Sequence, residues 1–166
     1  VRTSSFTRHH VNITMCKAKA NGNYINSMLA LREALDSGAE EALLLDNEGY
    51  VAEGSGENVF VVRDGRISTP DLTSCLDGIT RKTIFALAQE LGHEIVERRI
   101  TRDEVYVADE AFFTGTAAEV VPIRELDGRT IGSGSRGPIT EQLQTMYFDS
   151  VRGNRSQNSE WLDPVA

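Results

Sequence analysis

Lys19 carries the clearest chemical potential in this sequence, because it places a primary amine directly before a tight turn and a helix. It stands in the stretch Ala18-Lys19-Ala20-Asn21-Gly22-Asn23-Tyr24. The Asn-Gly pair predicts a turn, and apolar residues recur at helical spacing after it. A lysine fixed there can lose part of its solvation, which favours the neutral amine that attacks an aldehyde. A solvated surface lysine fits the same spacing, so the rest of the chain decides between the two.

Three other stretches could bind a ligand. Glu53-Gly54-Ser55-Gly56-Glu57-Asn58 combines carboxylates with glycines that let the backbone approach a ligand closely. Gly78-Ile79-Thr80 opens a helical pattern, and the free N–H groups of a helix start can hold a phosphate, although ordinary capping accounts for the same residues. Thr114-Gly115-Thr116-Ala117-Ala118 is a hydroxyl-rich turn that could seat a second anion.

Together these groups suit pyridoxal phosphate. That cofactor needs an amine for its aldehyde, an anion beside its pyridine nitrogen, and N–H or hydroxyl donors for its phosphate. Lys19, Glu53 and the helix start at Ile79 and Thr80 supply the three kinds of group.

The elements that position these residues follow from hydrophobic periodicity and turn residues, and they indicate an α/β fold. Helices are expected at 24–37, 79–91, 101–107 and 138–151, the third opened by a capping box at Thr101-Arg102-Asp103-Glu104. The first of these should bury Ile25, Met28, Leu29, Leu31, Ala34 and Leu35. Strands are expected at 1–6, 41–46, 50–53, 59–62, 66–69, 94–98, 111–113 and 119–123, with those from 41 to 69 forming a β meander.

Composition limits the possible functions. The chain has 166 residues, 40% of them hydrophobic, and is expected to be one domain over 1–152 followed by a surface tail over 153–166. The net charge of −8 without a basic block disfavours a nucleic-acid partner. No apolar run is long enough to span a membrane, and a cytoplasmic location is expected. No role is assigned to His9, His10, Cys16, Cys75 and Trp161, and no metal site is expected.

The sequence also resembles a known family over nearly its whole length. It is similar to the C-terminal, cofactor-binding domain of branched-chain amino acid aminotransferases, which are pyridoxal phosphate enzymes of fold type IV. The resemblance is carried by the stretches 18–24 and 53–60, by Gly78-Ile79-Thr80-Arg81, by the run 108–119 from Ala108 to Glu119, and by Gly137-Pro138-Ile139-Thr140. It implies a mixed sheet partly closed into a barrel with flanking helices.

The resemblance implies a role for each matching residue. Lys19 would be the Schiff-base lysine and the base that moves a proton in catalysis. Glu53 would face the pyridine nitrogen, Tyr24 the phenolic oxygen of the cofactor, and Leu76 its ring. The phosphate would be held by Ile79, Thr80 and Thr116, and the substrate carboxylate by the amides of Thr116 and Ala117.

The implied reaction transfers the amino group of leucine, isoleucine or valine to 2-oxoglutarate. Two members of the same fold type, D-amino acid transaminase and aminodeoxychorismate lyase, remain alternatives, as does a non-catalytic module that binds a phosphate ligand. Because the chain opens at Val1 without an initiator Met, we expect a fragment lacking an N-terminal domain, with little or no activity alone. The resemblance further implies a homo-oligomer.

Overall fold

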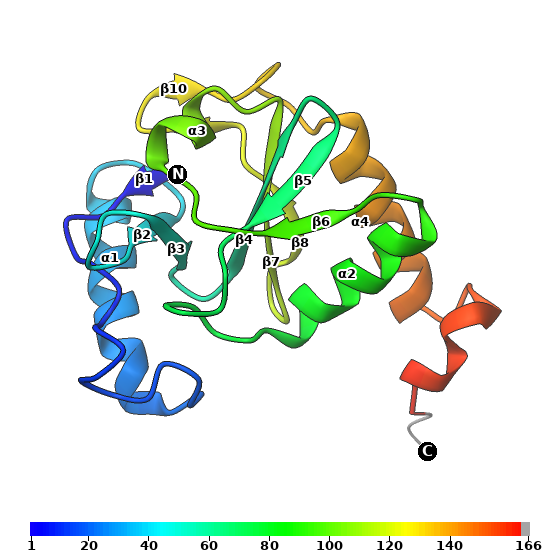
Figure 1. The fold of residues 1–166 in the computed structure, drawn as a ribbon, viewed down its shortest axis with the longest axis horizontal. Coiled ribbons are helices and arrows are strands. Elements are labelled where there is room, and N and C mark those ends of the chain that lie inside the picture. The colour runs from blue at the N-terminus through cyan, green and yellow to red at the C-terminus, as the bar shows by residue number, and fades with distance from the viewer. Residues whose placement is uncertain (164–166) are drawn as a thin grey trace.

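The computed structural model describes residues 1–163 and shows a mixed α/β fold (Figure 1). The helices are α1 Tyr24–Asp36, α2 Ile79–Glu90, α3 Arg102–Tyr106 and α4 Pro138–Val151, with short 3-10 helices η1 at Asn21–Asn23 and η2 at Ser156–Trp161. The strands are β1 Arg2–Thr3, β2 Ala42–Leu45, β3 Val51–Gly54, β4 Asn58–Arg63, β5 Arg66–Thr69, β6 Ile95–Glu97, β7 Glu110–Gly115, β8 Glu119–Pro122, β9 Glu125–Leu126 and β10 Arg129–Thr130.

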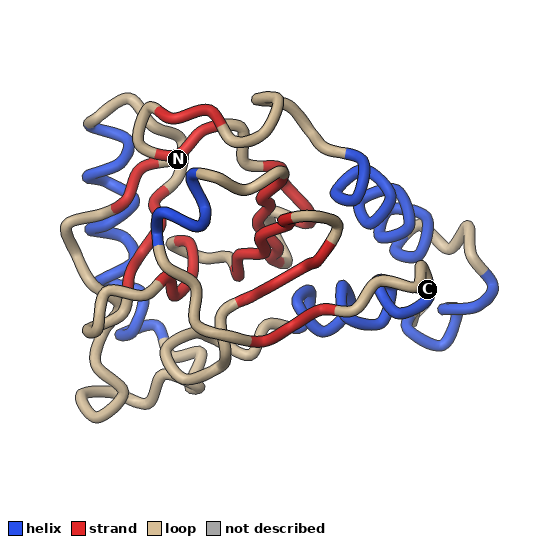
Figure 2. Tube along the Cα trace, turned by 45° about the horizontal axis from the view of Figure 1, so that its top comes forward, coloured by secondary structure: helices blue, strands red, loops and turns tan. Residues whose placement is uncertain are grey.

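The strands form three separate sheets. One has the order β1-β2-β3, the second the order β6-β5-β4-β7-β8, and β9 pairs with β10. Helix α1 lies against the three-stranded sheet at one side of the molecule, whereas α2 and α4 pack against the five-stranded sheet at the other side (Figures 1 and 2). The two larger sheets therefore lie between α1 on one side and α2 and α4 on the other.

The chain changes sheets at the glycine loop, and this corrects the expectation of one continuous meander. The hairpin of β2 and β3 and the hairpin of β4 and β5 both form, but β3 and β4 belong to different sheets. Gly54 ends the first sheet and Asn58 begins the second, so the loop 55–57 spans the gap. The alternating pattern of strands and turns cannot distinguish hairpins within one sheet from hairpins in two.

Two hydrophobic cores fix the five-stranded sheet on its two faces. On one face Val59, Val61, Ala111 and Phe113 pack with Leu43 and Val51 of the three-stranded sheet and with Ile100 and Val105 near α3. On the other face Phe60, Val62 and Phe112 pack with Ile84 and Leu87 of α2 and with Leu143 of α4. The alternation along β4 produces this division, since successive side chains point to opposite faces.

The predicted buried face of α1 is largely wrong. Ile25, Met28, Leu29 and Leu35 are 48–66% exposed, and the buried side chains are Ser27, Ala30 and Ala34. Ala30 and Ala34 pack against Ala42 and Leu44 of β2. Small side chains allow the helix to lie close to the sheet, so α1 buries its small residues and leaves its large apolar ones outside.

The other predicted helices and strands agree with the structure to within a few residues, except that the strand expected at 1–6 shortens to β1. The short elements β9, β10, η1 and η2 were not predicted. The capping box that opens α3 is present: the backbone N–H of Thr101 donates to Glu104 Oε2 at 2.8 Å. After α4, the side chain of Asn158 is buried and binds Ser150 and Glu90, while Trp161 is 44% exposed. The tail expected to start at 153 also includes residues 164–166, which lie outside the described part. No helix between residues 1 and 163 has the length and apolarity to cross a membrane.

Candidate active site

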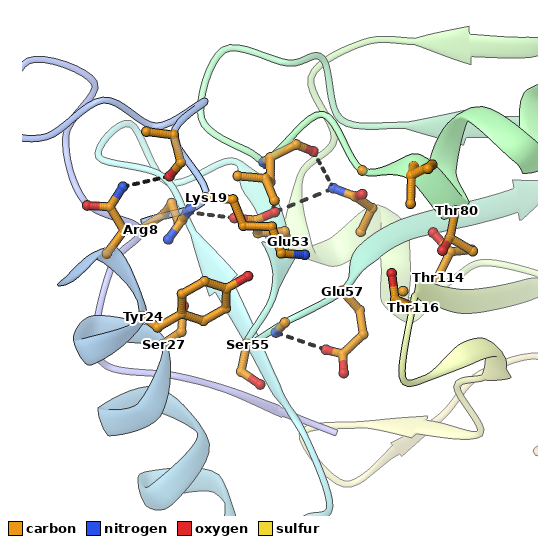
Figure 3. A pocket seen from close by; sticks show the side chains of 18 residues that line it. Arg8, Lys19, Tyr24, Ser27, Glu53, Ser55, Glu57, Thr80, Thr114 and Thr116 are labelled. Atoms are coloured by element: carbon orange, nitrogen blue, oxygen red, sulfur yellow. Dashed lines mark hydrogen bonds and ion pairs between the residues drawn. The ribbon is translucent and has the colours of Figure 1, made fainter. Parts of the chain in front are cut away.

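A pocket opens where the chain passes from β3 to β4, and residues from five separate segments line it (Figure 3). The predicted residues that line it are Lys19, Tyr24, Glu53, Leu76, Ile79, Thr80 and Thr116. Arg8, Asn23, Ser27, Ser55, Glu57, Asn58 and Thr114 also line it. Ala117 follows Thr116 in the turn between β7 and β8, is exposed, and lies outside this set. The fold thus brings together residues as far apart in sequence as Arg8 and Thr116.

The segment that carries Lys19 is tied to the start of α1. The Asn23 side-chain amide donates to the carbonyls of Met15 and Ala18, each at 3.0 Å. These two bonds hold the backbone that directly precedes Lys19. Lys17 Nζ donates to the carbonyl of Cys75 at 3.2 Å, whereas Lys19 lines the pocket. Of these two amines, only that of Lys19 is directed to the pocket.

Lys19 is exposed, so the described residues do not supply the desolvation expected from the sequence. The surrounding segments form the floor and walls of the pocket beside the lysine and leave its own side chain open to solvent. The sequence pattern before α1 predicts that the lysine is held in position, but it does not report how much of the chain covers it.

Glu53 is the buried anion of the site. Its side chain is 8% exposed, and Arg8 Nε lies 2.6 Å from its Oε1. Its other oxygen accepts a hydrogen bond from the backbone N–H of Leu76 at 3.0 Å. Burial raises the pKa of the Glu53 carboxyl above its ordinary value, while the Arg8 charge and the Leu76 N–H act in the opposite direction. Arg8 is therefore the counter-ion that favours the ionised form of this carboxylate.

Hydroxyls and backbone donors gather on the side of the pocket opposite Arg8 and Tyr24. Thr80, Thr114 and Thr116 lie together there (Figure 3). The N-cap residue of helix α2 is Gly78, which has no side chain to cap the helix. The first N–H groups of the helix are therefore available to a ligand. The Thr114 hydroxyl is buried and has no hydrogen-bond partner among the described residues. A buried donor without a partner beside an uncapped helix start is a suitable place for an anion.

Glu57 introduces a second carboxyl at the pocket wall. Its Oε2 accepts from the N–H of Gly56 at 3.1 Å. Burial, followed by the nearby Glu41 carboxylate, raises the pKa of Glu57 to about 7. Glu41 Oε1 in turn accepts from the N–H of Ser55 at 3.2 Å, so both carboxyls fasten the glycine loop.

Sequence reasoning missed Arg8 and Thr114. Arg8 lies in an irregular connection with no local motif. Its backbone N–H donates to the carbonyl of Leu45 at the end of β2, and this bond holds the segment of Arg8 against the three-stranded sheet that contains Glu53. Thr114 belongs to the hydroxyl-rich turn that the sequence did indicate, but its burial depends on its position in β7 opposite Asn58.

The histidines and cysteines lie outside the pocket lining. His10 Nδ1 accepts from the N–H of Asn12 at 3.1 Å, and Cys16 and Cys75 are buried free thiols. Among residues 1–163, no three or more His, Cys, Asp or Glu side chains are arranged to hold a metal ion.

Comparison with known proteins identifies the family of the chain. The sequence model of the family described as Amino-transferase class IV matches residues 1–126. The chain belongs to the class IV aminotransferases.

Relatives of the chain within that family are named more specifically, as branched-chain-amino-acid aminotransferases. The chain is 69% identical over 161 residues to the branched-chain-amino-acid aminotransferase of Pseudomonas aeruginosa, covering 97% of this chain and 52% of that protein. It is 45% identical over 163 residues to that of Escherichia coli K12, covering 98% and 53%. The chain thus spans about half the length of the curated relatives it matches.

Solved structures show the same fold. The branched-chain amino acid aminotransferase of Thermobaculum terrenum in its PLP form has a TM-score of 0.97 at 46% identity and covers 99% of this chain and 54% of its own. The corresponding enzyme of the archaeon Thermoproteus uzoniensis, solved with norvaline, has a TM-score of 0.95 at 46% identity and covers 99% and 55%.

Proposed function

We propose that this chain is the cofactor-binding part of a pyridoxal-phosphate-dependent aminotransferase that transfers the amino group of leucine, isoleucine or valine to 2-oxoglutarate. The observation that carries the proposal is the meeting of Lys19, Glu53 and the uncapped start of α2 in one pocket. Relatives that share up to 69% identity are named as branched-chain-amino-acid aminotransferases, and this supports the choice of substrate.

The donor set fits the cofactor. A pyridoxal phosphate molecule presents an aldehyde at one edge of its ring, a ring nitrogen, and a phosphate. Lys19 offers the amine, and Glu53, whose ionised form Arg8 favours, offers the partner for a protonated ring nitrogen. The buried, unpartnered hydroxyl of Thr114 and the free N–H groups of α2 suit a phosphate.

In this proposal, different residues of the chain have different roles toward the cofactor and the substrate. When bound, the cofactor supplies an aldehyde that joins to amines and a ring that withdraws electrons from the bound substrate. Lys19 Nζ would hold the cofactor and would also serve as the base that moves the proton of the substrate Cα. Glu53 keeps the ring nitrogen protonated. Tyr24 donates to the phenolic oxygen, and Leu76 packs against the ring.

The side of the pocket opposite Arg8 and Tyr24 binds two anionic groups, the cofactor phosphate and the substrate carboxylate. Ile79, Thr80 and Thr116 bind the phosphate, and the amides of Thr116 and Ala117 orient the substrate carboxylate. Ala117 is exposed in the turn after β7, so its backbone is accessible to a substrate that enters from solvent.

An assay of products tests the reaction. The purified full-length protein is given leucine, isoleucine or valine with 2-oxoglutarate, and glutamate formation is measured against a D-alanine donor and an aminodeoxychorismate substrate. The proposal predicts glutamate from the three branched-chain L-amino acids. Preferred use of the D-amino acid indicates the D-amino acid transaminase reaction, and release of pyruvate from aminodeoxychorismate indicates the lyase. No reaction together with phosphate-ligand binding indicates the non-catalytic module.

We further propose that an N-terminal domain of the full-length protein covers the pocket and that the assembled protein is a cytoplasmic homo-oligomer. The exposure of Lys19 and the greater length of the relatives support the cover. Restoring the remaining polypeptide should strengthen cofactor binding and turnover relative to residues 1–166 alone, because a cover excludes water and orients the substrate. Equal activity of the two forms would contradict this proposal.

We retain two finer proposals about the fold. One is that the two larger sheets act as a partly closed barrel, supported by the shared core in which Leu43 and Val51 of one sheet meet Val59 and Phe113 of the other. The other is that the cofactor-binding domain spans 1–152 and a separate tail follows, supported by the end of α4 at Val151.

A further inference from the structure

Asn58 lies between the carboxylate of Glu53 and the segment that leads into α2. It is the first residue of β4 and is 5% exposed. Its Nδ2 donates to the carbonyl of Leu76 at 2.8 Å and to Glu53 Oε2 at 3.4 Å. Because the N–H of Leu76 also donates to Glu53 Oε2, these three residues form a closed ring of hydrogen bonds.

The oxygen of the Asn58 amide lies close to Gly78, the N-cap residue of α2. A Cβ atom added to Gly78 would lie 2.2 Å from Asn58 Oδ1. The backbone of Gly78, with φ −68° and ψ 140°, is one that any residue adopts, so glycine is required here for space alone. Asn58 therefore contacts both ends of the segment 76–78, at Leu76 by a hydrogen bond and at Gly78 by close packing.

We propose that Asn58 is a positioning residue that sets the distance between the Glu53 carboxylate and the N-terminus of α2, so that one ligand engages both. This inference rests on the proposed function, in which Glu53 binds the ring nitrogen and the start of α2 binds the phosphate. A ligand held at two points binds tightly only when the two points have the spacing of its own groups. Asn58 is the side chain that links the two points directly.

Two ligands that differ only in the phosphate separate positioning from general support. Pyridoxal phosphate uses both ends of the site, whereas pyridoxal, which lacks the phosphate, uses only the ring end. Dissociation constants for both are measured in the full-length protein by absorbance titration. Thermal unfolding of the cofactor-free protein reports whether each variant is folded.

Three variants disturb the link in different ways. Asn58→Ala removes the amide, and Asn58→Asp keeps its shape but cannot donate to the carbonyl of Leu76 and repels Glu53. Gly78→Ala keeps the Asn58 side chain but adds a Cβ 2.2 Å from its Oδ1, which forces residue 78 and Asn58 apart. Asn154→Ala is the control for Asn58→Ala, because Asn154 is an exposed asparagine outside the pocket lining.

Each of the three variants should weaken pyridoxal phosphate binding on the order of tenfold, because a buried acceptor or a close contact loses its partner. Pyridoxal binding should change little in Asn58→Ala and Gly78→Ala, since Arg8 and the N–H of Leu76 still hold Glu53. Asn58→Asp also places a charge beside Glu53, so for this variant only the pyridoxal phosphate affinity is interpreted. Asn154→Ala should leave both affinities unchanged. If Asn58→Ala fails to fold, Gly78→Ala still provides the comparison.

Equal losses for the two ligands in Asn58→Ala and Gly78→Ala, or no loss for either ligand, would overturn the inference. Retention of full pyridoxal phosphate affinity by Asn58→Asp would show that Asn58 acts by shape alone and would overturn it as well. If the unaltered protein bound neither ligand, the proposed function would fail, and the inference with it. That result is distinguishable because it appears before any substitution is made.

Discussion

Arg8 Nε lies 2.6 Å from Glu53 Oε1, and the two side chains are 6% and 8% exposed. The contact is electrostatic rather than a well-aligned hydrogen bond, since Arg8 Nε has no acceptor in hydrogen-bonding geometry among the described residues. Removing one member of a buried ion pair leaves the other charge without compensation. The state of Glu53 therefore depends on a residue 45 positions away in sequence.

Replacing Arg8 with methionine should destabilise the protein in a pH-dependent manner. The pKa of Glu53 is already raised by burial, and loss of the Arg8 charge raises it further. A carboxyl whose pKa is raised in the folded state contributes stability below its unfolded pKa and loses it as the pH rises through the folded pKa. The loss in free energy of unfolding should therefore be small near pH 5 and reach about 3–5 kcal/mol near pH 8, as measured by denaturant titration.

The double variant Arg8→Met/Glu53→Gln provides the control. With both charges removed, the buried site no longer contains an unpaired ion, so the double variant should be more stable near pH 8 than Arg8→Met alone. A loss that is the same at pH 5 and pH 8 would contradict the ion-pair account.

The sequence predicted several of the residues that meet at the pocket, but not how they are held. Lys19, Glu53 and Thr80 each lie beside a turn or a helix start that short-range patterns reveal. Arg8 and Asn58 act through contacts between segments that are remote in sequence or that belong to different sheets. The Asn58 contacts follow from the change of sheet between Gly54 and Asn58, and the Arg8 contact follows from the path of an irregular segment along the three-stranded sheet. Periodicity carries no information about either.

Replacing Glu53 with glutamine should separate cofactor binding from chemistry. The neutral amide can still accept from the N–H of Leu76 but no longer favours a protonated ring nitrogen. The rate of a single transamination half-reaction should fall by about a hundredfold or more, because the ion pair to the ring is worth several kcal/mol in the transition state. Glu48→Gln, at an exposed position, is the control and should leave the rate unchanged. An unchanged rate in Glu53→Gln would assign the ring nitrogen to another residue.

Glu57→Gln should become stabilising relative to the unaltered protein as the pH rises. Burial and the Glu41 carboxylate raise the pKa of Glu57 to about 7, so its contribution to stability is present below pH 4.5 and is lost as the pH rises through 7. Glutamine resembles the protonated form and does not ionise. Denaturant titrations at pH 5 and pH 8 measure the difference.

Glu33→Gln is the matched control for that measurement. Hydrogen bonds from Ser4 and Ser5 lower the pKa of Glu33, so its contribution is lost only as the pH falls below the usual carboxyl range. Its effect should be the same at pH 5 and pH 8. A Glu57→Gln effect that is equally independent of pH would show that Glu57 is ionised throughout this range.

The burial of α1 shows where sequence patterns fail for a different reason. The apolar residues of this helix do recur at helical spacing, but the helix packs on β2 through Ala30 and Ala34. A hydrophobic stripe indicates burial against some surface, and it does not tell whether that surface is the nearest sheet. The small residues decide here because they permit the closest approach.

The central claim is that Lys19 carries the cofactor, and covalent mapping tests it most directly. The full-length protein is incubated with pyridoxal phosphate, reduced with borohydride, digested, and analysed by mass spectrometry. Lys17 is an internal control, since its Nζ is bound to the carbonyl of Cys75 while Lys19 lines the pocket. The account predicts one reduced adduct, on Lys19, and its disappearance in Lys19→Ala but not in Lys17→Ala. An adduct on Lys17, or adducts spread over several lysines, would contradict it.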